Sequence, residues 1–233
     1  MAEINETAVR LPLLALRGLV VFPKTVASFD VARKKSANAL KAAMDRDQLL
    51  FVSTQKDFYV EEPSEKDLYE IGTVVKIKQI LKISDNVIKV LVEGLYRAKR
   101  LTFKSGIQYM VADVLACEEK ELSNREVYKE SLLRRIKARF NSYAAVLPNI
   151  APDVVMTVEN SDSVDFLCDY IAFNIPAPFD DKQYVLEQTS VSKRAKILLE
   201  LLDKEREITE IDRKINEKTR ATIDENQKQY YLK

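Results

Sequence analysis

The sequence predicts an α+β protein in which a mostly antiparallel, β-rich N-terminal subdomain precedes an α-helical bundle. Three observations support this prediction. Apolar and polar residues alternate between Ile71 and Leu95, Leu11–Arg17 is apolar on both faces of a strand, and after Glu118 the apolar spacing becomes helical. We expect a β-rich subdomain at 1–118, a helical bundle at 119–189 and a long helix packing on it at 190–233.

The stretch from Leu11 to Pro23 has nine apolar residues in thirteen. It is too short to cross a bilayer, which takes about 20 apolar residues. Pro12 lacks a backbone donor and Gly18 interrupts the run, so we expect an edge or barrel-rim strand at 11–17. In this strand Leu13 and Ala15 face one way, and Leu14 and Leu16 the other. Since both faces are apolar, later parts of the chain must cover it.

Further elements before residue 118 follow from local patterning. Strands are expected at 26–32, 49–52, 97–103 and 109–116, and a charged surface loop at 56–67. An amphipathic helix is expected at 33–45, with Ala37, Leu40 and Met44 on its apolar side. About six strands and one helix close most economically as a small, mostly antiparallel sheet or partial barrel.

The clearest pattern is a β-hairpin between Ile71 and Leu95 with its turn at 84–86. The alternation predicts an inner face made of Val75, Ile77, Leu81 and Ile83. It predicts an outer face made of Lys76, Lys78 and Lys82. Ile80 falls on the lysine face, beside a turn where polar residues are usual, so we expect it to be exposed.

Helical spacing dominates after residue 118. Predicted helix starts are Ser123 in a capping box with Glu126, Pro152, Asp162, and Asp180 or Asp181. The first helix carries the apolar stripe Leu133, Ile136, Phe140, Ala144 and Leu147. Ser190 is the expected N-cap of a last helix with no Gly or Pro before Lys233. At about 1.5 Å per residue it would span roughly 66 Å, so we expect a rigid arm leading to another domain or partner.

Composition excludes several kinds of catalyst. The chain has no histidine, which removes His-based catalysis and most catalytic zinc sites, and its 4 glycines are isolated, so no phosphate-binding loop is present. Cys117 and Cys168 are too few for a disulfide framework or a metal knuckle. A net charge of +1 gives no single-sign surface, and the N-terminus has no apolar signal segment. We expect a cytoplasmic, non-catalytic chain with no cofactor or metal of its own.

Four segments of the chain form a characteristic series. They are LPLLALRGLVVFP at 11–23, DLYEIGTV at 67–74, VLVEGLYRA at 90–98 and NQKQYYL at 226–232. In this order they resemble the N-terminal region of the Lon family of ATP-dependent proteases. Ala15 stands where that family often has Pro, Gly18 where Asp is common and Lys24 where Gly is common. These departures lie at loop rims and leave the expected fold unchanged.

The resemblance implies a cytoplasmic, hexameric enzyme with a downstream ATPase module, which uses ATP and Mg²⁺, and a downstream Ser-Lys protease module. Neither module is among these 233 residues. The chain would be the substrate-recognition domain of a protease that degrades misfolded and regulatory proteins. Its partners would be unfolded or damaged proteins, the ATPase and protease domains, and further copies of itself, with no membrane or nucleic acid expected.

Two other functions stay open on the sequence. The family's first subdomain resembles PUA-like folds that hold RNA, and a nucleic-acid-binding module would use Lys76, Lys78, Lys82 and Lys89. Lysines on the exposed side of a strand more commonly serve solubility and edge protection. A free-standing dimeric interaction domain would use the last helix as a coiled coil, but Ile208, Ile211 and Ile215 cover only about one and a half heptads.

A domain that selects unfolded proteins needs exposed apolar groups, because unfolding exposes apolar segments. The hairpin offers Ile80, with Leu81 and Ile83 at its border, and the end of the first strand offers Phe22 and Pro23. We predict substrate binding at these five residues. The alternative is that Ile80 packs under a neighbouring loop and Phe22 closes the end of the barrel.

Overall fold

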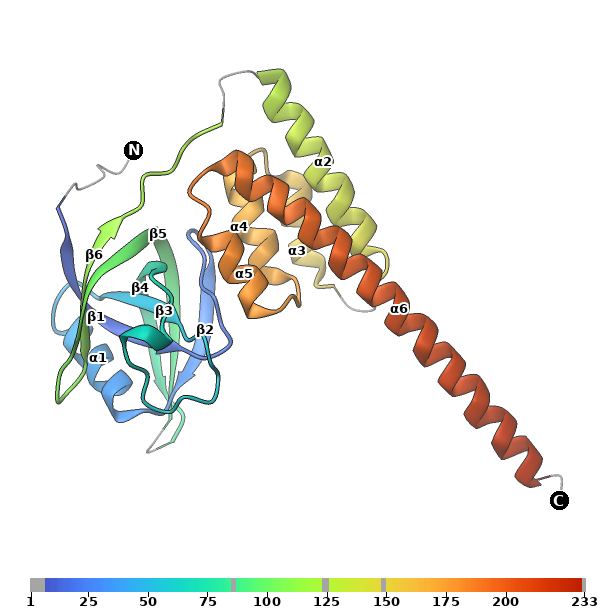
Figure 1. Cartoon of the computed structure of the whole chain (residues 1–233), viewed down its shortest axis with the longest axis horizontal. Coiled ribbons are helices and arrows are strands. Elements are labelled where there is room, and N and C mark those ends of the chain that lie inside the picture. Colours follow the sequence, from blue (N-terminus) through green and yellow to red (C-terminus); the bar gives the residue numbers. More distant parts are fainter. Residues whose placement is uncertain (1–6, 85–86, 123–125, 148–149, 232–233) are drawn as a thin grey trace.

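The computed structural model describes residues 7–84, 87–122, 126–147 and 150–231, and it shows a β-rich part, a helical part and one projecting helix (Figure 1). The α+β class is confirmed. The strands are β1 (Val9–Leu16), β2 (Val26–Val31), β3 (Leu49–Thr54), β4 (Ile71–Lys82), β5 (Ile88–Ser105) and β6 (Met110–Ala116). Helix α1 (Lys34–Met44) lies between β2 and β3, and a short 3-10 helix (Glu65–Asp67) precedes β4.

The six strands form a mixed sheet in the order β2-β5-β4-β3-β1-β6, and a second pairing of β5 with β6 closes a barrel. Only the pairing of β1 with β3 is parallel. The two strands expected on either side of residue 96 are one 18-residue strand, β5. It stays continuous because register shifts around Leu95 and Leu101 let it bend from one half of the sheet to the other.

Of the two positions predicted for β1, an edge of the sheet or the rim of a barrel, the edge is wrong, because β1 lies between β3 and β6. Pro12 is tolerated there since β3 pairs with β1 only from Leu13 onward. The predicted two-sided burial of β1 is confirmed. Leu13 and Ala15 pack in the core inside the barrel, and Leu14 and Leu16 pack in a second core that α1 covers.

Helix α1 is confirmed, but its buried face differs from the predicted one. The buried residues are Ser36, Ala39, Leu40 and Ala43, whereas Met44 is exposed. Small residues face the sheet because they let the helix lie close to β1 and β3, which it contacts. Of the residues predicted on the apolar side, Leu40 is therefore part of the core and Met44 is not.

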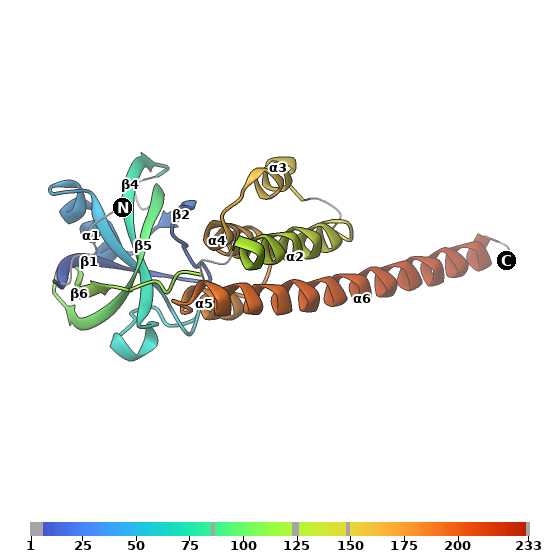
Figure 2. The same cartoon turned by 90° about the horizontal axis from the view of Figure 1, so that it is seen from above.

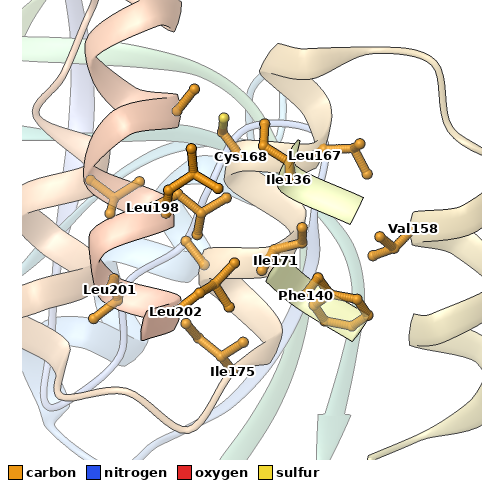
Figure 3. Packing of buried hydrophobic residues seen from close by; sticks show 14 of the residues in the cluster. Ile136, Phe140, Val158, Leu167, Cys168, Ile171, Ile175, Leu198, Leu201 and Leu202 are labelled. Carbon is orange, nitrogen blue, oxygen red and sulfur yellow. The ribbon is translucent and has the colours of Figure 1, made fainter. Parts of the chain in front are cut away.

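The helical part contains α2 (Glu126–Ala144), α3 (Pro152–Asn160), α4 (Val164–Asn174), α5 (Phe179–Leu186) and the start of α6 (Val191–Tyr231). Seen from above, these helices lie beside the sheet and α6 runs past them (Figure 2). Their core includes Ile136, Phe140, Leu167, Ile171 and Leu198 (Figure 3). On α2 the predicted Ile136 and Phe140 are buried, but Leu132 and Tyr143 complete the stripe in place of Leu133 and Ala144.

Helix starts follow the prediction within a few residues. Pro152 is the first residue of α3, and α4 is capped by Ser163 rather than the predicted Asp162, because the Ser163 Oγ accepts the Phe166 N–H. Helix α5 begins one or two residues earlier than predicted, after Pro178. The predicted cap at Ser123 lies outside the described residues.

Helix α6 outgrows the bundle, as the sequence predicts. Among its side chains up to Arg220, the last buried one is Glu205, and every side chain from Ile211 to Arg220 is exposed. Figure 1 shows the helix projecting well beyond the other helices.

Because a helix without tertiary packing is marginally stable, we expect backbone amides of residues 211–220 to exchange roughly a hundredfold or more faster than those of residues 191–202. Hydrogen exchange followed by mass spectrometry on the 233-residue chain measures both windows. Equal protection in the two windows would show that the arm is packed, most simply against a second copy.

Candidate functional site

The tip of the β4–β5 hairpin carries the exposed apolar residues of the predicted site. Ile80, Leu81 and Ile83, here called the tip patch, are 36 %, 47 % and 59 % exposed. Ile80 is exposed as predicted, but it shares the face of the buried Val90 instead of the lysine face where it was expected. Leu81 and Ile83 were expected on the inner face with Val75 and Ile77, and that expectation is wrong.

A β-bulge explains the difference. Ile77 pairs with Val92, but the next pair is Gln79 with Leu91, so Lys78 is an extra residue in β4. One extra residue moves every following side chain to the opposite face. Ile80 therefore pairs with the buried Val90, whereas Leu81 pairs with Lys89 on the outer face. The tip patch thus has apolar side chains on both faces of the hairpin.

Ion pairs neutralise much of the charge around the tip patch. Lys78 Nζ lies 2.5 Å from a Glu93 carboxylate oxygen, and Lys89 Nζ lies 3.0 Å from an Asp30 oxygen. Two of the four lysines proposed as a nucleic-acid footprint are therefore already paired with carboxylates. This arrangement suits an apolar ligand better than a polyanion.

Phe22 and Pro23 lie elsewhere and are buried, so their expected exposure is wrong. Phe22 is 0 % exposed and packs in the core of the helical part, together with Val20. The segment after β1 therefore joins the two parts of the molecule instead of presenting a surface. The structure does not bring Phe22 and Pro23 together with the tip patch.

Polar contacts also hold the two parts together around this segment. Lys24 Nζ donates to Asp165 Oδ2 at 2.8 Å, and Gln183 Nε2 donates to the Ile71 carbonyl at 2.9 Å. Burial alone would raise the pKa of Asp165, but hydrogen bonds from Lys24 and Ser163 outweigh it and hold that pKa at about 2. Asp165 is thus an ionised anchor for the segment that follows β1.

The centre of the junction is a buried ionic cluster that sequence reasoning missed. Arg97 on β5 and Arg194 on α6 are 1 % and 0 % exposed. Arg97 donates to Asp169 on α4, to Glu119 at 2.7 Å and to the Leu186 carbonyl at 2.9 Å. Arg194 Nη2 donates to Glu119 Oε2 at 3.0 Å, and its Nη1 lies 3.4 Å from Asp169 Oδ1.

The cluster balances two cations with two anions. Burial would raise the pKa of Glu119, but the hydrogen bonds and charges of Arg194 and Arg97 outweigh it and lower that pKa. These four residues are far apart in the sequence, so no local pattern reveals them. The one feature of the sequence that points to this cluster is that Arg97 lies inside the family-like segment 90–98.

Neither cysteine is positioned for chemistry. Both thiols are free, and burial raises the pKa of Cys168 and of Cys117. Across the described ranges, no group of three or more Cys, Asp or Glu side chains is arranged to hold a metal ion. In the same part of the chain, no helix has the length and apolar character needed to span a membrane.

The fold and this site define an α+β domain in which a β-barrel with an exposed apolar hairpin tip is joined to a helical bundle through a buried ionic cluster. Comparison with known proteins agrees. The family model of the ATP-dependent protease La (LON) substrate-binding domain matches residues 10–204. The chain belongs to this family, which confirms the resemblance read from its four segments.

Relatives match the chain along its whole length. The Lon protease of Syntrophomonas wolfei is 39 % identical over 99 % of this chain, and Lon protease 1 of Bacillus subtilis is 34 % identical over 100 % of it. The chain covers only 28 % and 30 % of those proteins. A solved N-terminal domain of a Mycobacterium avium complex Lon protease superposes with a TM-score of 0.69 at 19 % identity, over 84 % of this chain and 98 % of that one.

Proposed function

We propose that this chain is the substrate-engaging N-terminal domain of a cytoplasmic, ATP-dependent Ser-Lys protease that degrades misfolded and regulatory proteins. Family membership and the relatives named Lon protease support the proposal. The chain itself would be non-catalytic, and ATP and Mg²⁺ would be used by an ATPase module beyond it. By the same resemblance, the full-length protein would assemble into a hexamer.

The tip patch is the observation that carries the substrate-binding role. Where soluble proteins expose apolar side chains in a contiguous patch, the patch is often an interaction site. Here three of them lie at the end of a projecting hairpin, flanked by charges that are paired with each other. We propose that the patch binds apolar segments of unfolded proteins.

Replacing Leu81 and Ile83 together by Ser is expected to weaken binding of a permanently unfolded protein, such as reduced and carboxymethylated lactalbumin, about tenfold or more. The free energy of unfolding should change by less than about 1 kcal/mol, because both side chains are exposed. Fluorescence anisotropy of the labelled ligand measures the binding.

The matched control replaces Val127 and Met156, two exposed apolar residues of the helical part, by Ser. This variant should bind like the unchanged chain. If both double variants bind equally well, the tip patch is not the substrate surface. If binding instead collapses on modest salt addition and competes with RNA, the nucleic-acid alternative is favoured.

A further inference from the structure

Strand β2 ends the sheet, and its outer side is unpaired within the described residues. It pairs with β5 alone, from Val26 with Glu93 to Val31 with Ile88. The Gly94 N–H donates to the Thr25 carbonyl at 2.9 Å, which fixes the alternation of the ladder. Ala27, Phe29 and Val31 therefore exchange hydrogen bonds with β5. The N–H and C=O groups of Val26, Ser28 and Asp30 point away from it.

The free edge of β2 lacks the features that normally prevent pairing with another chain. Such edges usually carry lysines, prolines or bulges. The pairing of β2 with β5 is regular, without a register shift, and the strand contains neither Pro nor Lys. Its one charged residue, Asp30, is paired with Lys89 at 3.0 Å.

The opposite side of the same three-stranded region provides a contrast. Beyond the end of its pairing with β3, β4 carries the Lys78 bulge and Lys82. Both features discourage strand addition. One edge of the hairpin region is therefore protected and the other is open.

Apolar side chains flank the open edge on both faces. Val26 is 56 % exposed on the outer face, and Phe29 is partly buried against the core of the inner face. A strand added about 4.8 Å from β2 would place its alternate side chains beside these two residues. The six residues of β2 match an extended segment of similar length.

We propose that the outer edge of β2 binds an extended segment of an unfolded protein as an additional β-strand. This inference rests on the proposed function and names how the substrate backbone is held. Backbone hydrogen bonds are available in every unfolded sequence, so such a site accepts many substrates, while the tip patch adds a preference for apolar ones.

Hydrogen exchange by NMR tests the proposal on the unchanged chain. With saturating reduced and carboxymethylated lactalbumin, the amides of Ser28 and Asp30 should exchange at least tenfold more slowly, whereas those of Ala27 and Phe29 should change little. Unchanged Ser28 and Asp30 amides in a chain that binds the ligand would overturn the inference.

A variant that changes the backbone of β2 provides a second test of the proposal. Ser28→Pro removes an outward N–H without removing a bond to β5, so the chain should stay folded and bind the ligand at least tenfold more weakly. Ser28→Ala keeps the N–H and should bind within twofold of the unchanged chain. If Ser28→Pro binds normally while the Leu81/Ile83 variant binds poorly, the edge proposal fails and the proposed function stands.

Measuring the oligomeric state tests the other possible occupant of the β2 edge, a second copy of this chain. Protection of Ser28 and Asp30 without ligand, together with a dimer in sedimentation, would mean that a second copy of this chain pairs along β2 and would overturn the proposal. If the unchanged chain does not bind the unfolded ligand at all, the proposed function itself is refuted.

Discussion

Replacing Asp169 by Asn is expected to lower the free energy of unfolding by about 3–5 kcal/mol. Asp169 is 4 % exposed and faces both Arg97 and Arg194. Without its charge, two buried guanidinium groups share one carboxylate, Glu119, which is partly exposed. Removing one partner of a buried ion pair lowers the free energy of unfolding by more than the intact pair adds to it, because the remaining charge stays buried without a partner. Urea unfolding at neutral pH measures the loss.

Asp203→Asn is the matched control, since Asp203 pairs with Arg139 at 2.8 Å on the surface between α2 and α6. That change should cost less than about 1 kcal/mol. Adding Arg194→Met to Asp169→Asn removes the excess charge and should restore part of the loss. Equal losses for Asp169→Asn and Asp203→Asn would show that the cluster does not hold the two parts together.

The cluster also explains why the two parts form one unit. Arg97 comes from β5, Glu119 from the segment before α2, Asp169 from α4 and Arg194 from α6. Four separate elements therefore each contribute one charge to the cluster. The contacts of the cluster therefore connect the β-rich part directly to α6.

Periodic features of the fold could be predicted from the sequence because they are local. Successive side chains of a strand point to opposite faces, and Leu11–Leu16 contains no polar residue. Both faces of β1 are therefore apolar and buried. The helix starting at Pro152 follows from the fixed φ angle of proline. Elements of this kind need no information about their neighbours.

The bulge at Lys78 could not be predicted in the same way. Bulges are often marked by glycine, and lysine gives no such signal. Once the extra residue is present, Leu81 and Ile83 move to the outer face, which turns two predicted border residues into the most exposed part of the tip patch. The site residues were thus named for partly incorrect structural reasons.

The prediction that Phe22 is exposed failed for a different reason. An apolar residue in a loop after a strand indicates exposure only if nothing later in the chain covers it. Here Phe22 belongs to the same buried cluster as Leu167 and Ile171, which lie more than a hundred residues further along the chain. Burial of this kind is set by tertiary packing and has no local pattern.

Gly94→Ala is expected to cost about 3 kcal/mol or more and to destabilise both parts together. A Cβ at this position would lie 2.0 Å from the Phe22 carbonyl oxygen and 3.2 Å from the Pro23 Cα. Because these atoms belong to the backbone, they can move only if the Lys24 and Thr25 hydrogen bonds to Gly94 are broken. Phe22 would then leave the helical core, so loss of the contact reaches both sides of the junction.

Gly18→Ala separates this steric effect from backbone strain. Gly18 has φ 62°, but its nearest neighbour, the Phe58 ring, would lie 3.6 Å from the new Cβ. It should cost only about 1–2 kcal/mol, the ordinary penalty of a left-handed residue. Circular dichroism during urea unfolding follows both variants. If Gly94→Ala unfolds at the same urea concentration as Gly18→Ala, then close approach of the two family-like segments at Phe22 and Gly94 does not fix the junction.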